Sequence, residues 1–437
     1  MDVPETRYAT TADGLSIAYQ QFGRGPHVVW VTGTASNVEL FWELPGWAWT
    51  LRKLAERSTV TWFDKRGTGL SDRTLPSAAL EDRMEDIRAV MDHAGIGSAT
   101  LIGLSESGAM SAVFAAANPD RVERLVLVAS WAHRPDVEGA ELFEALWGRG
   151  ILLESIWAQG FSDRELLGRM ERAMGTPMSM AALLRANATF DVRPILPLVR
   201  TPTLVVHCTE DPIIPVEHGR ELAALIPGAT LVEVGGAFHG SARPEDMMRY
   251  ADAVEEFLGR ADQLPAPTSD RVLATVLFTD IVGSTDRAAA TGDAEWRATL
   301  DEHDHICARA VEAGRGRTVK LTGDGVLATF DAPASAVAAA HRMIQDLALV
   351  GLHIRAGVHT GEVERRGDDI GGIAVHLAAR VMAAAGAGEV WVSSTVPGLA
   401  IGAAVEFEPR GRHVLKGVPG EWELFATRLA AGARGRP

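Results

Sequence analysis

A proline-rich polar stretch divides this chain into two parts with different hydrophobic patterns. From Gly259 to Thr268 it reads GRADQLPAPT, a composition typical of an interdomain linker. The chain has 437 residues, more than one ordinary domain of ~150 residues needs. The sequence therefore predicts domains over residues 1–260 and 271–429, a linker at 261–270, and a disordered tail at 430–437.

The first part alternates short apolar runs with segments of helical period, such as Glu81–His93 and Gly219–Leu225. This alternation predicts an α/β domain with a mostly parallel sheet covered on both faces. The runs predicted to be buried strands are His27–Val31, Thr59–Phe63, Ala99–Leu104, Arg124–Ala129, Thr203–Cys208 and Thr230–Val234.

An interval without a strand pattern, about residues 131–197, is predicted to be a helical cap inserted over the sheet. Its large side chains could fill a plain core or form the wall of an adaptable apolar pocket, and the pattern leaves both interpretations open. These side chains are Trp131, Trp147, Trp157, Met170, Met174, Met178 and Met180.

The second part groups its strands around a central hairpin, which predicts an α+β domain and not a doubly wound sheet. Its predicted helices are Asp286–Ala313, Ala334–Leu349 and Ile373–Ala385. Its predicted strands are Ala274–Thr279, the hairpin Arg317–Phe330, His353–Val358, Glu389–Ser393, a run near Val405 and Trp422–Thr427.

Composition excludes several classes of partner. The net charge of −15 argues against nucleic acid and against an anionic membrane surface. Cys208 and Cys307 fall in different predicted domains, so we expect no disulfide framework and a reducing, cytoplasmic location. No signal peptide is visible at Met1–Glu5, and no apolar run reaches the ~18 residues of a membrane span.

A serine follows one predicted strand of the first part, in GLSESG from Gly103 to Gly108, where a helix begins. Such a strand-to-helix turn exposes the hydroxyl of Ser105 above the sheet. Asp211 and His239 each follow a later predicted strand. This order, with each residue beyond the C-terminal end of a strand, resembles the α/β-hydrolase family.

The resemblance implies that Ser105 is a nucleophile, His239 its general base and Asp211 the residue that orients His239. It also implies an oxyanion hole formed by the backbone N–H groups of Glu106 and Thr34. The domain would then hydrolyse a small or medium apolar ester. The alternative is a hydrolase fold kept as a ligand-sensing module that regulates the second domain.

Two departures from the family pattern bear on that choice. Ser107 stands where the family usually has glycine, so we expect some crowding at the turn. The loop Val31–Thr34 lacks the histidine that often precedes its glycine. We assign the segment Phe63–Asp72, which also resembles the family, a structural role.

Two aspartates of the second part end apolar β-runs in tight loops: Asp280 in FTDIVGST and Asp324 in VKLTGDG. Two such carboxylates can hold two hard divalent cations, and the backbone N–H groups after Asp280 suit a triphosphate. With the motifs that follow, residues 271 to about 428 resemble the catalytic domain of class III adenylyl/guanylyl cyclases.

That resemblance implies that Asp280, Asp324 and the Ile281 carbonyl bind two Mg²⁺ or Mn²⁺ ions, and that Lys320 and Asp369 read the purine. Adenine suits this pair, because its N1 accepts a hydrogen bond and its exocyclic amine donates one, whereas guanine reverses both roles. The expected substrate is ATP.

The resemblance also implies that Arg380 stabilises charge on the α-phosphate and that Lys416 contacts the outer phosphates. His376 stands where the family has an asparagine that holds the ribose, and it shares a helix face with Arg380. In this family the metal residues of one chain meet the purine-binding and arginine residues of another, which implies a homodimer.

The sequence therefore predicts an α/β-hydrolase fold with a helical cap, followed by a class III nucleotide cyclase domain of ferredoxin-like α+β fold. We expect an adenylyl cyclase that converts ATP to 3′,5′-cyclic AMP and pyrophosphate. The N-terminal domain would act as a serine esterase or a sensor. The alternative is chiefly a carboxylesterase whose inert cyclase fold serves dimerisation.

Overall fold

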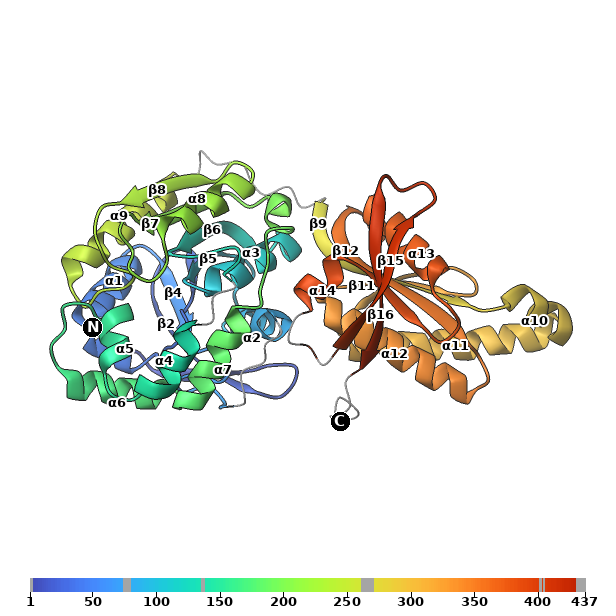
Figure 1. Cartoon of the computed structure of the whole chain (residues 1–437), viewed down its shortest axis with the longest axis horizontal. Helices are drawn as coiled ribbons and strands as arrows, with labels where there is room; N and C mark the ends of the chain where they lie inside the picture. The colour runs from blue at the N-terminus through green and yellow to red at the C-terminus, as the bar shows by residue number, and fades with distance from the viewer. Residues whose placement is uncertain are drawn as a thin grey trace. The chain divides into compact units, whose positions relative to one another are not determined.

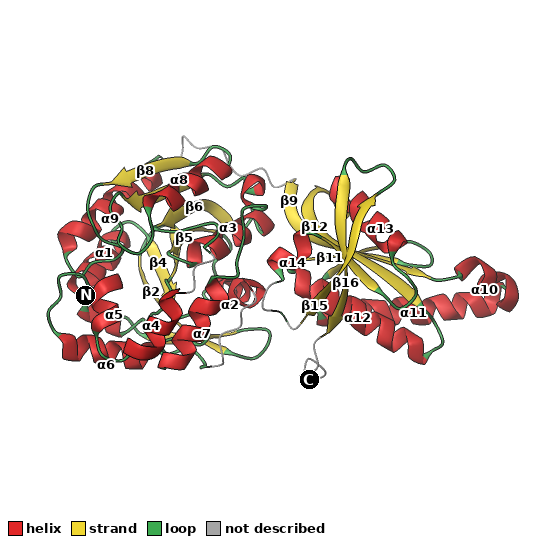
Figure 2. Ribbon diagram, viewed as in Figure 1, coloured by secondary structure: helices red, strands yellow, loops and turns green. Residues whose placement is uncertain are grey.

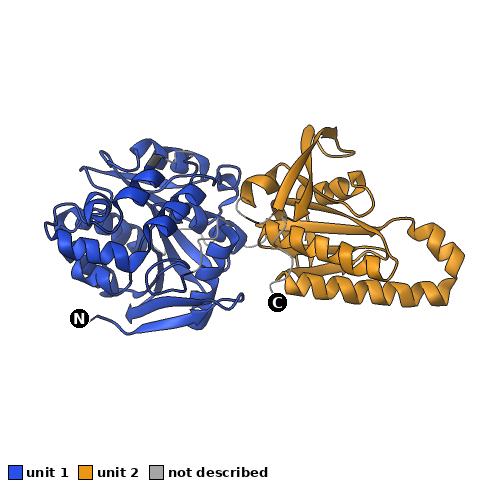
Figure 3. Ribbon diagram, turned by 60° about the horizontal axis from the view of Figure 1, so that its bottom comes forward, with its two compact units in different colours: residues 1–268 blue, residues 269–437 orange. Residues whose placement is uncertain are grey.

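The chain forms two compact units, Met1–Thr268 and Ser269–Pro437 (Figure 3). A computed structural model describes residues 3–73, 80–134, 138–260, 271–400, 403 and 405–429. The predicted linker at 261–270 and the predicted tail at 430–437 lie outside the described residues.

The first unit is built on an eight-stranded sheet in the order β1-β2-β4-β3-β5-β6-β7-β8 (Figures 1 and 2). Strands β3 to β8 pair in parallel, and β1 and β2 join them antiparallel at one edge, which confirms the mostly parallel sheet. Sequence analysis did not assign β1 and β2. The strands are β1 (Thr6–Thr10), β2 (Ser16–Gly23), β3 (His27–Val31), β4 (Thr59–Phe63), β5 (Ala99–Leu104), β6 (Val122–Val128), β7 (Thr203–Cys208) and β8 (Thr230–Val234).

Helices cover both faces of this sheet. Helices α1 (Pro45–Ala55) and α9 (Pro244–Gly259) pack against each other on one face. Helices α2 (Leu80–His93), α3 (Ser107–Ala117) and α8 (Val216–Leu225) cover the other face. Apolar residues of the strands are therefore buried on both sides, as expected for parallel strands.

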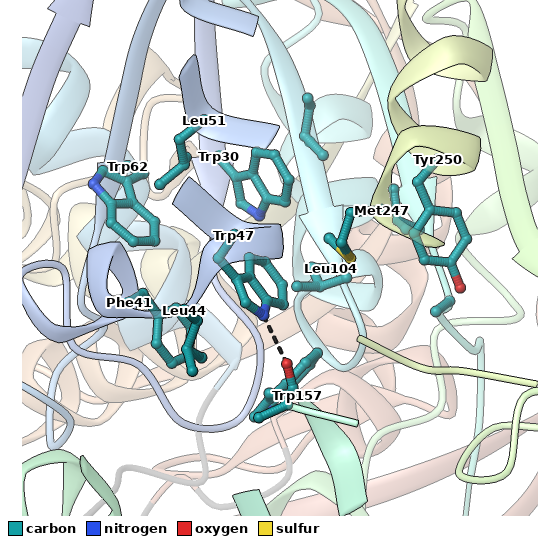
Figure 4. Packing of buried hydrophobic residues seen from close by; sticks show 14 of the residues in the cluster. Trp30, Phe41, Leu44, Trp47, Leu51, Trp62, Leu104, Trp157, Met247 and Tyr250 are labelled. Atoms are coloured by element: carbon teal, nitrogen blue, oxygen red, sulfur yellow. Dashed lines mark hydrogen bonds between the residues drawn. The ribbon is translucent and has the colours of Figure 1, made fainter. Parts of the chain in front are cut away.

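An aromatic cluster forms the core between α1 and the sheet (Figure 4). The ring of Trp47 lies 5.2 Å from that of Phe41 and 6.0 Å from that of Trp30. Trp47 Nε1 also donates a hydrogen bond of 2.8 Å to the carbonyl of Trp157. This bond joins the sheet's core to the segment that covers it.

The predicted helical cap is confirmed. Between β6 and the short 3-10 helix η2 (Leu196–Leu198) lie α4 (Glu138–Leu146), α5 (Ile151–Ile156), α6 (Arg164–Met174) and α7 (Pro177–Asn187). Helix α4 packs on α7 and α5 packs on α6. The buried Glu171 carboxylate accepts hydrogen bonds from the backbone N–H groups of Gly148, Gly150 and Leu153, which holds the entry to α5 in place.

The second unit is built on a sheet in the order β10-β11-β9-β12-β14-β16-β15, with β13 paired to β12. All these pairs are antiparallel except β12 with β14, which confirms an α+β domain. Its elements are β9 (Arg271–Ile281), α10 (Ser284–Thr291), α11 (Asp293–Ala313), β10 (Arg317–Leu321), β11 (Val326–Phe330), α12 (Pro333–Leu349), β12 (Ile354–Arg366), β13 (Asp369–Gly371), α13 (Ile373–Ala384), β14 (Val390–Ser393), α14 (Thr395–Leu399), β15 (Val405–Val414) and β16 (Glu421–Leu429).

Alternate residues of the central strand β9 face different helices. Leu277 and Ile281 pack in the cluster of α11 and α12, whereas Val272, Ala274 and Val276 pack in the cluster of α13. Since successive side chains of a strand point to opposite faces, Asp280 lies on the α13 side of the sheet.

Two elements differ from the prediction. The single helix predicted over Asp286–Ala313 is wrong, because the chain forms α10 and α11, which Gly292 separates at a φ of 81°. This left-handed conformation breaks a helix and favours glycine. Strand β12 also continues to Arg366, beyond the predicted end at Val358, and pairs there with β13. Its charged, exposed extension lacks the apolar pattern by which a buried strand is predicted.

Candidate active sites

Ser105 occupies a strained turn between β5 and α3. Its φ is 59°, a conformation that side chains other than glycine adopt at a cost. The flanking glycines permit the close packing of strand and helix. A Cβ on Gly103 would lie 2.7 Å from the Cα of Gly108, and one on Gly108 would lie 1.9 Å from Ser130 Oγ.

The structure brings together the three residues predicted as the hydrolytic site. Ser105 Oγ lies 3.0 Å from His239 Nε2, and His239 Nδ1 lies 2.8 Å from Asp211 Oδ2. The other carboxylate oxygen of Asp211 accepts hydrogen bonds of 2.8 and 2.9 Å from the N–H groups of Ile213 and Ile214. A carboxylate fixed in this way favours the His239 tautomer with a proton on Nδ1, which leaves Nε2 to accept from the serine.

These three side chains are almost fully enclosed. Ser105 is 4% exposed, His239 1% and Asp211 8%, and the Trp157 ring centre lies 4.9 Å from that of His239. A Cβ on Gly33 would meet the Trp157 ring at 2.5 Å. The loop after β3 can therefore pack this closely against Trp157 only because residue 33 is glycine.

A buried ion pair involves Glu106, the residue that follows Ser105 in the chain. Glu106 Oε1 accepts a hydrogen bond from Lys65 Nζ, and Glu106 Oε2 accepts one of 2.9 Å from Thr34 Oγ1. Burial lowers the pKa of Lys65, and the charge of Glu106 opposes this shift. The pair ties the turn at Ser105 to the loop that carries Thr34, and these segments hold the two backbone N–H groups predicted for an oxyanion hole.

Ser107 belongs to the same network. Its hydroxyl donates to the carbonyl of Thr32 and accepts a hydrogen bond of 3.1 Å from Lys65 Nζ. Ser107 therefore makes two hydrogen bonds that glycine could not make, and its short contact with the Thr32 carbonyl is compatible with the expected crowding. Sequence analysis gave the segment Phe63–Asp72, which contains Lys65, a structural role but did not predict its ion pair with Glu106. The available signal is the place of Lys65 next to the apolar strand β4, because a lysine buried there needs an acidic partner.

A cavity of about 350 Å³ opens onto Ser105 and His239 beneath the cap. Trp131, Trp147 and Trp157 contribute to its apolar wall, as the pocket interpretation predicts. The methionines do not line it: Met170, Met174 and Met180 are fully buried core residues, and Met178 is exposed. Its volume suits a small ligand.

In the second unit, the end of strand β9, which carries Asp280, lies beside the loop that carries Asp324. The Ile281 N–H donates a hydrogen bond of 2.8 Å to the Asp324 carbonyl. Asp280 Oδ2 accepts hydrogen bonds of 2.6 and 3.0 Å from Arg355, which is its register partner on β12. Asp324 Oδ2 accepts one of 2.5 Å from Ser284 Oγ.

This donor set fits hard divalent cations. Each carboxylate has one oxygen held by the protein, which leaves the other available, and carboxylate and carbonyl oxygens are the ligands that Mg²⁺ and Mn²⁺ prefer. In the described ranges, no three His, Cys, Asp or Glu side chains form a group that could hold a metal. The expected site contains only two such side chains, Asp280 and Asp324, besides the Ile281 carbonyl. The absence of a group of three such side chains therefore does not test it.

The predicted purine-binding residues contact each other. Lys320 Nζ lies 2.9 Å from Asp369 Oδ1 and 2.7 Å from Oδ2, and both side chains are exposed. The hydrogen bond from Lys320 lowers the pKa of Asp369. Strand β13 begins at Asp369, so the hairpin that sequence analysis missed is the element that positions this carboxylate.

His376 and Arg380 are exposed on one face of α13, and Arg380 Nε donates a hydrogen bond of 2.9 Å to the Lys416 carbonyl. Within the part of the chain that the structure describes, no hydrogen bond or ion pair joins these residues to Asp280 or Asp324. The predicted metal residues and the predicted residues of α13 in one chain are therefore not joined directly by hydrogen bonds or ion pairs among the described residues.

Of the helices that the structure describes, none combines the length and apolar character needed to cross a bilayer.

Family models match both units. One for the alpha/beta hydrolase fold matches residues 26–149, one described as TAP-like protein matches residues 186–270, and one for the adenylate and guanylate cyclase catalytic domain matches residues 265–427. The last range includes every residue predicted to act in nucleotide cyclisation.

Relatives align with large parts of the chain. RutD of Caulobacter sp. (strain K31), a proposed carbamate hydrolase, is 30% identical over 211 residues, 44% of this chain and 78% of that protein. An uncharacterized protein of Mycobacterium tuberculosis (strain H37Rv) is 26% identical over 331 residues, 68% of this chain and 92% of that protein.

Solved structures share the fold of the first unit. A hydrolase from Pseudomonas aeruginosa PA01 superimposes with a TM-score of 0.51 at 24% identity, over 58% of this chain and 98% of that chain. An esterase from Exiguobacterium antarcticum does so with a TM-score of 0.50 at 19% identity, over 58% of this chain and 100% of that chain. The chain therefore belongs to the α/β-hydrolase fold family in its first unit and carries an adenylate and guanylate cyclase catalytic domain in its second.

Proposed function

We propose that this chain is an adenylyl cyclase whose N-terminal domain is a working serine hydrolase for a small, largely apolar ester. The hydrolase assignment rests on the hydrogen-bonded series Ser105–His239–Asp211 at the wall of the 350 Å³ cavity. The choice of ATP rests on the donor and acceptor that Lys320 and Asp369 present together. The protein would act in the cytoplasm.

In the hydrolase domain, His239 Nε2 takes the proton of Ser105 Oγ as the oxygen attacks the ester carbonyl, and later delivers it to the departing alcohol. Asp211 stabilises the imidazolium and holds its orientation. The N–H groups of Glu106 and Thr34 would receive the oxyanion, with the Lys65–Glu106–Thr34 hydrogen bonds keeping their segments together. A water molecule then cleaves the acyl-serine by the same proton path.

We expect a fluorophosphonate probe to label the wild-type chain at Ser105, and Ser105→Ala to remove both the label and p-nitrophenyl butyrate hydrolysis. The reason is that the hydrogen bond to His239 activates this hydroxyl. Mass spectrometry of the labelled chain identifies the site, with Ser155→Ala as a control in the cavity wall. An unlabelled wild type would favour the alternative, a ligand-sensing domain.

In the cyclase domain, Lys320 donates to adenine N1 and Asp369 accepts from the exocyclic amine, which orients ATP for attack of its 3′ oxygen on the α-phosphorus. Pyrophosphate leaves, and Arg380 would stabilise the charge that develops on the α-phosphate. Lys416 would contact the outer phosphates, and His376 the ribose. Asp280, Asp324 and the Ile281 carbonyl would hold two Mg²⁺ or Mn²⁺ ions, whose chemistry there would be to supply positive charge near the triphosphate and the 3′ oxygen.

We expect ATP to be cyclised faster than GTP, and Lys320→Glu to reduce this preference, because the substitution replaces a donor by an acceptor. The measurement is the cyclic nucleotide formed from each triphosphate at equal concentration with Mn²⁺. Lys53→Glu, in the first unit, is the control. GTP turnover equal to or faster than ATP turnover by the wild type would contradict the assignment.

The active form would be a homodimer, because the likeness to cyclase catalytic domains implies that the metal residues of one chain meet the purine-binding and arginine residues of another. A second candidate is a carboxylesterase whose cyclase domain is inert and serves dimerisation. The complete hydrolytic site and the histidine at position 376, in place of the family's asparagine, favour this candidate.

A further inference from the structure

A second cavity lies at the edge of the first unit's sheet that is opposite to the catalytic serine. It has a volume of about 160 Å³, and Val28, Thr100 and Arg124, each near the start of its strand, line it. Because these strands are parallel, their starts lie at one edge of the sheet, whereas Ser105 follows the end of β5. The two cavities share no lining residue.

Three neighbouring strands form the floor of this cavity. Thr100 on β5 is the register partner of Val28 on β3 and of Arg124 on β6, so the three side chains point to the same face of the sheet. Val28 packs in the core cluster that α1 and α9 cover. Leu54 and Leu258, near the last turns of these two helices, also line the cavity. The Arg124 side chain therefore extends from the sheet into the space beneath the ends of α1 and α9.

Two arginines of this cavity lack a partner among the described residues. Arg124 is half-buried on β6, and Arg57 is exposed just after α1. Within the described part of the chain, neither guanidinium forms an ion pair or a hydrogen bond. Glu255, the acidic residue among the described lining residues, pairs with Lys53 at 3.6 Å. Because charged groups withdrawn from water are normally paired, two unpaired guanidinium groups at one cavity favour an anionic ligand.

The donors of this cavity can be reached by a ligand. Arg124 Nε is enclosed, but the other two nitrogens of this guanidinium and the hydroxyl oxygens of Ser58 and Thr100 are not among the enclosed atoms without a partner. Within the described residues these atoms form no hydrogen bond either. Ser58 and Thr100 are only 5% and 3% exposed, so their open hydroxyl groups face the cavity that these residues line.

We propose that this cavity binds a small organic carboxylate, with the carboxylate at Arg124 and Arg57 and the hydrocarbon part against Val28, Leu54 and Leu258. A guanidinium offers two parallel N–H groups that match the two oxygens of a carboxylate. The apolar floor favours a ligand with a hydrocarbon part over a fully hydrated anion such as inorganic phosphate. The volume limits the ligand to a small molecule.

This cavity is a binding site and not a second catalytic centre. The described residues that line it include no histidine or cysteine, so no base is present to activate the hydroxyl groups of Ser58 and Thr100. Through such a site the first unit would sense a carboxylate whether or not Ser105 turns over. The inference therefore does not depend on either proposed activity.

Calorimetric titration of the full chain with sodium hexanoate tests this inference. We expect saturable binding that Arg124→Met weakens by about tenfold or more, the value of a hydrogen bond to a charged group. Arg57→Met should also weaken binding, and because Arg57 is exposed this variant tests the site without a change in the core. Arg169→Met is the matched control, since it removes an exposed cation of α6 that pairs with Glu43, and it should bind like the wild type.

Circular dichroism and the melting temperature verify that each variant is folded. Binding that is absent from the wild type, or unchanged in both Arg124→Met and Arg57→Met, would overturn the inference, and unchanged binding would place hexanoate elsewhere, as in the cavity beneath the cap. Inorganic phosphate in place of hexanoate tests the ligand class. Tighter binding of phosphate than of hexanoate, lost in Arg124→Met, would contradict the assignment to a carboxylate.

Discussion

Asp324→Ala should abolish formation of the cyclic nucleotide while the fold remains intact. The substitution removes a carboxylate whose bound cation would stabilise transition-state charge by several kcal/mol, on the order of a thousandfold in rate. The backbone hydrogen bond of residue 324 with Ile281 would remain, and among the described residues the Asp324 side chain accepts a hydrogen bond only from Ser284. Asp280→Ala should have the same effect, since it removes the second carboxylate.

The measurement is cyclic AMP formed at saturating Mg²⁺–ATP, with circular dichroism and melting temperature to verify folding. Asp346→Ala provides a matched control, because Asp346 on α12 is half-buried and, among the described residues, forms just one ion pair, of 3.7 Å, with Arg342. Its rate should equal that of the wild type. Near-normal activity in either Asp280→Ala or Asp324→Ala would contradict the metal assignment.

Lys65→Met should destabilise the first unit by about 3–5 kcal/mol, the cost of leaving one member of a buried ion pair without its partner. The side chains of Lys65 and Glu106 are 3% and 1% exposed, so solvent cannot replace the lost partner. The double variant Lys65→Met/Glu106→Gln removes both charges and should lose less stability than Lys65→Met alone.

Urea unfolding followed by tryptophan fluorescence measures this loss, because most tryptophans of the chain lie in the first unit. Lys53→Met is the control, since the ion pairs of Lys53 with Glu56 and Glu255 are partly exposed to solvent. This substitution should change the free energy of unfolding by less than about 1 kcal/mol. If Lys65→Met proves as mild as Lys53→Met, the ion pair does not hold the turn at Ser105.

The strand ends explain why sequence alone located so much of the hydrolytic site. Ser105, Asp211 and His239 each follow an apolar run, and parallel strands place such positions at one edge of the sheet. Lys65 lies outside that logic. Tertiary packing brings it to its partner Glu106, and no local pattern encodes this contact.

The second unit shows a different limit. Its strand and helix order followed from apolar runs, but the break at Gly292 and the hairpin of β12 with β13 did not. A single glycine is tolerated within many helices, so Gly292 alone does not predict a break. An exposed two-stranded ribbon has no buried face, so its sequence lacks the alternation of apolar and polar residues that predicts a strand. The contact between Lys320 and Asp369, 49 positions apart, depends on that ribbon.

The central claim is that the second unit is an active adenylyl cyclase and not an inert dimerisation domain. Its most direct test incubates the purified full chain with ATP and Mn²⁺ and measures cyclic AMP and pyrophosphate. The account predicts that both products form in equal amounts and that the rate per chain falls on dilution, as expected if two chains share each site. No cyclic nucleotide from ATP or GTP at saturating Mn²⁺, in a preparation whose Ser105 still reacts with the fluorophosphonate, would contradict it.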